Sequence, residues 1–286
     1  MASSKNWLSV NRWGAAPALL FTAACFLAPL VAMALVSLSE RSGGRTVLTW
    51  TLDNYRGFVS RSDGAFVSAL INSIQVTVTV TILSVLAAYP LAYILAYRVP
   101  KRWQRVALVA IVLPFWTSYV IRSYSWLLVL SENGIISQTL LGLGITDGPV
   151  GLGNTRSATV LGFVHFFVML LTLTIYANLS QIKDSYRKAA ADLGANGLQI
   201  FLHVTLPLSM PGVAVGAFLT FVLAVGDYIT PQILGGGKEL LLPQAIMLQI
   251  GRAADFPMAS ALSMILMLVV TAAYLLFARY LRMERV

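Results

Sequence analysis

The chain has 286 residues, of which 58% are hydrophobic and only 11% are charged. Because soluble domains carry about 25% charged residues, this composition excludes an ordinary soluble protein and predicts an all-α integral membrane protein. The net charge of +9 raises the question of a nucleic-acid partner, and Cys25, the only cysteine, excludes an internal disulfide.

Six apolar runs follow one another along the chain, and each is long enough to cross a bilayer as a helix. We expect six transmembrane helices at about residues 15–38, 69–97, 106–130, 157–179, 210–233 and 257–281, within a single membrane domain that covers residues 1–286. The first run could be a cleavable signal peptide, since residues 32–34 resemble a cleavage site. It is longer than a signal-peptide core, however, and we favour a retained helix. Pro90 is expected to kink the second span, and a short lateral helix is expected at about residues 53–59.

Basic residues concentrate in the segments on one side of these spans. With the N-terminus inside, the inner segments hold twelve of the 20 Lys and Arg residues but only three of the 11 Asp and Glu residues. Because Lys and Arg are enriched in cytoplasmic loops, we place both termini in the cytoplasm. The positive charge is then a topology signal with an affinity for anionic membrane lipid, and a nucleic-acid partner is not expected.

The longest polar segment on the inner side, residues 180–207, has the pattern of two short helices around a glycine. Gly194 is placed to end the first helix in a left-handed conformation. Asn196 is placed to cap the second helix. On pattern alone, the segment could equally be an amphipathic connector that lies among the lipid headgroups.

The same segment resembles the EAA loop of the permease subunits of ABC-type importers, whose pattern is E-A-A-x3-G-x9-I-x-L-P. Lys188 replaces the usual glutamate, which reverses a charge, and Val204 replaces isoleucine, which is conservative. The resemblance implies a coupling helix that docks into a cleft of a separate ATPase. The residues it implies for this contact are Arg187, Lys188, Ala189, Ala190, Asp192, Leu193, Gly194, Val204, Leu206 and Pro207.

Two further segments, residues 114–126 and 226–236, are similar to segments of the polyamine-type (spermidine/putrescine) importer permeases. With the six-helix layout, the similarity covers nearly the whole chain. It implies the type I ABC importer fold in a bacterial cytoplasmic (inner) membrane. It also implies three kinds of partner: a second permease, usually a related but different chain, two ATPase subunits and an extracytoplasmic substrate-binding protein. ATP and Mg²⁺ would bind to the ATPase, since the sequence has no phosphate-binding loop motif and no cofactor is expected on this chain.

Ionisable residues inside the expected spans are few. At about 1.5 Å per residue, Arg122 and Asp227 both lie roughly 25 Å from the inner surface, so they could form an ion pair or reach outward to water. Alternatively, they line the outer mouth of a substrate pathway, where a carboxylate among aromatic rings would attract a cation. That pathway set is Trp116, Tyr119, Arg122, Tyr124, Asp227 and Tyr228. We expect Trp126 to belong instead to the interfacial aromatic belt.

Neither a metal site nor a catalytic group is expected. His165 and His203 have no Cys, Glu or second His at metal-ligand spacing. The predicted function is therefore ATP-driven import of a small, polyamine-like cation by alternating access between outward- and inward-open states. A gradient-driven secondary transporter or channel is the alternative function. An opine, an amino-acid derivative or another small organic solute is the alternative substrate.

Overall fold

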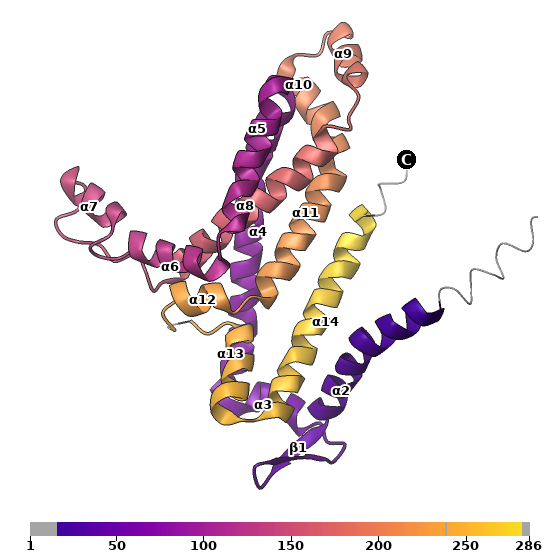
Figure 1. The fold of residues 1–286 in the computed structure, drawn as a ribbon, viewed down its shortest axis with the longest axis vertical. Coiled ribbons are helices and arrows are strands. Elements are labelled where there is room, and N and C mark those ends of the chain that lie inside the picture. Colours follow the sequence, from indigo (N-terminus) through magenta and orange to yellow (C-terminus); the bar gives the residue numbers. More distant parts are fainter. Residues whose placement is uncertain (1–15, 238, 282–286) are drawn as a thin grey trace, which may run out of the picture. The chain divides into compact units, whose positions relative to one another are not determined.

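The computed structural model describes residues 16–237 and 239–281, and helices dominate it (Figure 1). The chain divides into two compact units. The first contains the residues up to Phe66 together with Ala245–Ile265. The second contains Val67–Gln244 together with the residues from Leu266 onward.

The first unit begins with an apolar helical run, Ala16–Ser37, which contains the π-helical turn η1 (Ala23–Leu27) and α2 (Ala28–Ser37). Strands β1 (Ser39–Ser42) and β2 (Arg45–Leu48) then form an antiparallel hairpin. The hairpin was not predicted, because its strands are short and largely exposed and so lack the alternating pattern of a half-buried strand.

The predicted lateral helix is confirmed as α3 (Asp53–Ser60), which the 3₁₀ turn η2 (Arg61–Gly64) follows. Asn54 on α3 is buried, and its side-chain amide donates to the carbonyls of Ser37 and Ser39 at 3.0 and 2.7 Å. These two bonds fix α3 against the end of α2. The unit is completed by the last residues of α13 (Leu242–Leu248), the π-helical turn η5 (Gln249–Ala253) and the first part of α14 (Phe256–Leu281).

The second unit is built on three long helices: α4 (Ala65–Tyr97), α8 (Arg156–Leu179) and α11 (Leu206–Gly226). Shorter helices connect or follow them: α5 (Lys101–Val112), η3 (Leu113–Trp116), α6 (Tyr119–Val129), α7 (Ile135–Gly142), α9 (Asp184–Asp192), α10 (Gly197–Ile200), η4 (Phe201–Thr205) and α12 (Ile229–Leu234). Within this unit, α9 and α10 lie at one end of α8 and α11, and α6 and α12 lie at the other end (Figure 1). We call these the α9 end and the α12 end.

Five helical runs of the described residues are long and apolar enough to cross a membrane, and one bent pair of helices could form a sixth span. The five runs are Ala16–Ser37, Ala65–Tyr97, Arg156–Leu179, Gly197–Gly226 and Phe256–Ala278. They overlap the first, second, fourth, fifth and sixth predicted spans. Helix α4 continues through Pro90.

The third predicted span, expected as one helix over residues 106–130, is instead broken. Lys101–Trp116 and Tyr119–Val129 meet at an angle of 90°. Thr117 and Ser118 between them have extended backbone, with ψ of 144° and 134°. The Pro114 carbonyl beside the bend accepts from the Thr117 hydroxyl at 2.7 Å and from the Arg122 guanidinium at 2.9 Å. Two side chains thereby satisfy a backbone acceptor at the bend.

The fifth predicted span, expected over residues 210–233, is displaced toward the N-terminus. Its helical run starts at Gly197 and stops at Gly226, and Asp227 is extended. Helix α12 is a separate element after this stop. The run starts earlier than expected because the chain passes from α10 through η4 into α11 without a break.

Helices α8 and α11 pack closely along their length. Gly212 and Gly216 lie one turn apart on α11, and a Cβ atom at either position would meet α8. At Gly212 it would lie 2.4 Å from Asn178 Cβ, and at Gly216 it would lie 2.6 Å from Leu171 Cδ2. Small residues allow helices to approach closely in membranes, so these glycines set the α8–α11 spacing.

Candidate functional site

The predicted two-helix segment at the α9 end forms from its local signals. Helix α9 ends before Gly194, whose φ of 85° lies in the left-handed region that favours glycine. The Gly194 amide donates to the Ala191 carbonyl at 2.9 Å, and the Ala195 amide donates to the Ala190 carbonyl at 3.0 Å. This pair of bonds is the Schellman arrangement, so Gly194 closes α9 and turns the chain.

Helix α10 begins with a capping box at Asn196. The Gln199 amide donates to Asn196 Oδ1 at 2.9 Å, and the Asn196 amide donates to Gln199 Oε1 at 2.8 Å. Two backbone donors that the helix start leaves free are thereby satisfied. Val204, Leu206 and Pro207 consequently lie in the first turns of a long helix, where the sequence predicted the end of a loop.

Most of the residues that the resemblance implies for ATPase contact lie on the surface of this segment. Leu193 is 90% exposed. Lys188, Ala189, Asp192, Gly194 and Pro207 are also exposed, whereas Ala190, Val204 and Leu206 are partly buried. A groove of about 380 Å³ is lined by Ala190, Leu193, Gly194, Ala195, Gln199, His203 and Val204. The segment therefore presents a groove with exposed apolar groups to its surroundings.

Arg187 differs from the rest of this set. Its guanidinium carbon lies 4.0 Å from the ring centroid of Tyr97, the last residue of α4. Its side chain is 29% exposed, whereas that of Asp184, one turn earlier, is 73% exposed. Arg187 thus points back toward the transmembrane helices, away from the open surface.

A larger cleft of about 950 Å³ opens at the same end between α8, α9 and α11. Its polar lining comes from Thr174, Asn178, Gln181, Lys183 and Tyr186. The Asn178 Oδ1 atom is buried and has no hydrogen-bond partner in the part of the chain that the structure describes. The cleft has the volume of a small-molecule site, which is about 300–1,000 Å³.

At the α12 end, Asp227 is held by three donors. Its carboxylate accepts from the Ile229 amide at 2.8 Å, from the Thr230 hydroxyl at 2.7 Å and from the Tyr119 hydroxyl. The first two bonds hold Asp227 against the first turn of α12, and the third joins Asp227 to α6. Asp227 is therefore oriented by its own neighbours before any solute arrives.

The hypothesis of an ion pair between Arg122 and Asp227 is wrong. Among the described residues no salt bridge joins the two side chains. Arg122 turns instead to the Pro114 carbonyl, and its guanidinium carbon lies 4.9 Å from the ring centroid of Phe166 and 5.5 Å from that of Tyr119. Each side chain takes its hydrogen-bond partners locally, because the bend before α6 offers an acceptor to Arg122 and the start of α12 offers donors to Asp227.

The aromatic residues predicted around this cluster divide into two groups. Trp116, Tyr124 and Tyr228 are 85%, 53% and 39% exposed, and Tyr119 lies partly buried between α6 and α12. Trp126, which we expect in an interfacial belt, donates through its indole nitrogen to His165 Nδ1 at 3.1 Å.

Three further residues contact this predicted set and were not predicted from the sequence: Phe166 beside Arg122, Thr230 beside Tyr119 and His165 beside Trp126. They come from α8 and α12, and no spacing in the sequence indicates that these helices meet α6.

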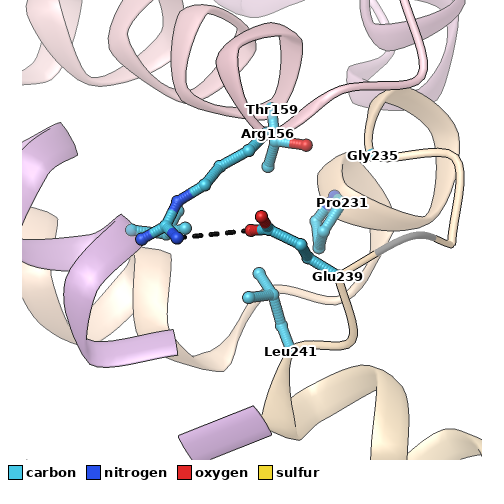
Figure 2. Close-up of a pocket in the computed structure, with 7 residues that line it drawn as sticks. Arg156, Thr159, Pro231, Gly235, Glu239 and Leu241 are labelled. Atoms are coloured by element: carbon cyan, nitrogen blue, oxygen red, sulfur yellow. Dashed lines mark hydrogen bonds and ion pairs between the residues drawn. The ribbon is translucent and has the colours of Figure 1, made fainter. Parts of the chain in front are cut away.

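A second polar contact joins α4, α8 and the segment after α12, and Figure 2 shows the part of it between Arg156 and Glu239. Arg156 donates to the Gln75 side-chain oxygen at 2.9 Å and pairs with Glu239 at 3.3 Å. The pocket beside it holds only about 10 Å³, which is about one water molecule. This contact is therefore a structural tie and has no room for a solute. No group of three or more metal-ligating side chains is found among the residues that the structure describes.

Comparison with known proteins identifies the fold. Residues 88–283 match the family described as "Binding-protein-dependent transport system inner membrane component". The chain belongs to this family. The match contains both the two-helix segment at the α9 end and the Tyr119–Asp227 cluster at the α12 end. The protein is thus a permease of the ABC importer class, and both clusters are parts of a transport protein.

Curated relatives cover most of the permease. The spermidine/putrescine transport system permease protein PotB of Escherichia coli (strain K12) is 30% identical over 258 residues, which are 90% of this chain and 92% of PotB. PotB of Salmonella typhimurium (strain SL1344) is 29% identical, with 90% of this chain and 88% of the relative covered. The inner membrane ABC transporter permease protein YdcU of E. coli (strain K12) is 32% identical, with 81% of this chain and 76% of YdcU covered.

Solved structures share the fold of the permease at low sequence identity. A chain of a bacterial ABC transporter involved in the import of the acidic polysaccharide alginate superposes with a TM-score of 0.76 over 99% of this chain and 97% of that chain, at 15% identity. A chain of the MetNI methionine ABC transporter in inward-facing conformations superposes with a TM-score of 0.57 over 76% of this chain and 94% of that chain, at 17% identity. The permease therefore has the ABC importer permease fold.

Proposed function

We propose that the permease pairs with a second, related permease to form a pathway for a small solute in a bacterial inner membrane. An extracytoplasmic binding protein delivers the solute, and two cytoplasmic ATPase subunits drive alternating access. ATP and Mg²⁺ bind to those subunits. Membership of the importer family and the relatives' description as permeases support this proposal.

The main evidence for ATPase coupling is the exposed groove at the α9 end, together with Leu193. This segment is the longest polar segment on its side of the predicted spans, yet Leu193 is 90% exposed there. Leu193 lines a groove whose backbone is fixed. Exposed apolar side chains in such a groove are typical of a surface that binds a protein partner. Gly194 and Asn196 make that backbone rigid, so little ordering entropy is lost when the partner binds. We therefore assign residues 180–207 to the coupling contact and place the α9 end in the cytoplasm, together with both termini.

For the solute, we propose a small cation of the polyamine class. Spermidine and putrescine are the substrates named for the PotB relatives. In the permease, Asp227 forms no ion pair with Arg122 in the described structure, so its negative charge is available to attract a cation. Exposed aromatic rings at Trp116, Tyr124 and Tyr228 add cation–π attraction. The solute would leave through the cleft of about 950 Å³ at the α9 end.

Affinity purification followed by reconstitution tests the proposal. The tagged permease, extracted in mild detergent from its own host, is expected to bring down an ATPase and a second permease. In proteoliposomes that contain the whole complex, uptake of labelled spermidine should require two components. These are ATP on the side of the ATPase subunits and the binding protein on the opposite side. Uptake by the purified single chain, driven by an ion gradient without ATP, would refute the proposal and establish the secondary-transporter alternative.

A further inference from the structure

Helix α4 carries three tyrosines at intervals of four residues, Tyr89, Tyr93 and Tyr97. This spacing places them on one face of the helix over two successive turns. The rings make edge contacts with one another and with Phe201 of η4. Tyr93 lies 5.1 Å from Tyr97, and both Tyr93 and Tyr89 lie against Phe201, at 5.6 and 5.8 Å between ring centroids. We call this row the tyrosine ladder.

The ladder connects three helices at the α9 end. The Tyr97 hydroxyl donates to the Leu179 carbonyl at the end of α8, at 3.2 Å. The Tyr89 hydroxyl shares a 2.7 Å hydrogen bond with the Ser209 hydroxyl on α11. Leu179 and Ser209 are both fully buried, so these bonds lie where water does not compete. The ladder therefore holds α4, α8 and α11 as one body at this end.

Arg187 joins α9 to this body. Its guanidinium carbon lies 4.0 Å from the Tyr97 ring centroid, which is close for a cation–π contact. Its Nε atom is buried and has no hydrogen-bond partner within the described chain. The paired carboxylate of Asp184 is 73% exposed and 3.6 Å away, so water screens that ion pair. Contact with the Tyr97 ring is therefore the main interaction that offsets the free-energy cost of burying part of the Arg187 guanidinium.

We propose that Arg187 is a positioning residue that transmits the movement of α9 to α4 through the ring of Tyr97. The inference rests on the proposed function, in which α9 moves with the ATPase. It reverses the role implied for Arg187 by resemblance, because Arg187 acts within this chain and the neighbouring residues make the ATPase contact. When α9 is pulled by its partner, the Arg187–Tyr97 joint and the tyrosine ladder carry the end of α4 with it.

A distance measurement in the purified complex tests the joint. Cys25 is the only cysteine, so the Cys25→Ala permease accepts two nitroxide labels, at Ser185 on α9 and at Ile94 on α4, both exposed. Pulsed electron–electron double resonance then gives the α9–α4 distance in the nucleotide-free complex and after trapping with ATP and vanadate. In the parent protein we expect one narrow distribution that is the same in both states, because α9 and α4 move together.

Arg187→Gln and Tyr97→Leu should each separate α9 from α4 in the trapped complex. A cation–π contact of this kind shifts an equilibrium by about two- to thirtyfold, so the population at the parent distance should fall by that factor relative to the separated population. The double variant should be no worse than either single variant, because both remove the same contact. Tyr97→Phe keeps the ring and Arg187→Lys keeps the charge, so both should retain the parent distance better than the disruptive variants. Arg98→Gln, which removes an exposed neighbouring charge, should behave like the parent protein.

Three results would overturn the inference. Unchanged distances in Arg187→Gln and Tyr97→Leu would show that the joint carries no movement. Fully additive effects in the double variant would show that Arg187 acts on another partner, such as the ATPase. Absence of any ATPase from the parent complex would overturn the proposed function and the joint together, whereas the first two results leave the proposed function standing.

Discussion

Gly194 allows the docking proposal to be tested by side-chain size alone. Its φ of 85° makes every L-residue strained, at a cost of about 1–2 kcal/mol, and Ala and Trp both pay this cost. A Cβ atom at Gly194 meets nothing of this chain within 4 Å. The isolated permease should therefore tolerate Gly194→Ala and Gly194→Trp to the same degree, with equal thermal midpoints in detergent.

The two variants should differ once the ATPase is present. If a partner fills the space beside Gly194, the Trp side chain overfills a packed contact, which costs about 1–3 kcal/mol or about 5- to 150-fold in affinity. Co-purification of the ATPase should fall by that factor in Gly194→Trp relative to Gly194→Ala, and ATP hydrolysis stimulated by the binding protein should be lost with it. Equal ATPase recovery with both variants would show that nothing docks beside Gly194 and would refute the assignment of this segment.

Three other substitutions test the packing and polar contacts. Gly216→Ala places a methyl group 2.6 Å from Leu171 Cδ2 and should destabilise the permease by about 1–3 kcal/mol, measured as a lower thermal midpoint in detergent. Asp227→Asn removes the negative charge and should lower the rate of spermidine uptake while the complex still assembles. Asn54→Ala removes two buried hydrogen bonds of 3.0 and 2.7 Å and should cost about 1–3 kcal/mol, measured as faster proteolysis at the hairpin.

For each of these three predictions there is a control variant or a result that would contradict it. Gly142→Ala adds the same methyl group where nothing lies within 4 Å, so it should leave the thermal midpoint unchanged. If Gly216→Ala behaves like Gly142→Ala, the close approach of α8 and α11 is not maintained in solution. Equal spermidine uptake by Asp227→Asn would show that Asp227 has only a structural role beside the start of α12. For the hairpin, Ser60→Ala removes a single exposed hydrogen bond and should not change proteolysis there.

The α9 end could be predicted from the sequence because its signals are local. A left-handed glycine, a capping Asn and a Gln three residues later specify their own backbone within a few residues, and Gly194, Asn196 and Gln199 do so in the structure. The start of the fifth span was harder to place. The sequence predicted a second short helix capped by Asn196 and a separate span from about residue 210, yet the helix that begins after Asn196 continues to Gly226.

The α12 end could not be predicted in the same way, because its contacts join distant parts of the chain. Tyr119 and Asp227 are 108 positions apart, and the position of each depends on how two helices stop. Equal depth in the membrane suggested that Arg122 and Asp227 would pair. Depth alone does not decide a pairing, since each group takes the nearest partner that its own backbone break provides. The break had one signal in the sequence, Pro114, which lies three residues before the extended Thr117.

The early start of the fifth span also changes how the two ends can communicate. The run Gly197–Gly226 contains 30 residues, and at about 1.5 Å per residue a helix of that length is roughly 45 Å long. It begins one residue after Asn196, the N-cap of α10, and stops one residue before Asp227. A loop over residues 195–207 would have absorbed a displacement of α9, whereas a packed helix passes it on. The glycines at 212 and 216 hold this helix against α8, so a push at α10 must move α8 and α11 together. Asp227 and the start of α12 lie at the far end of that movement.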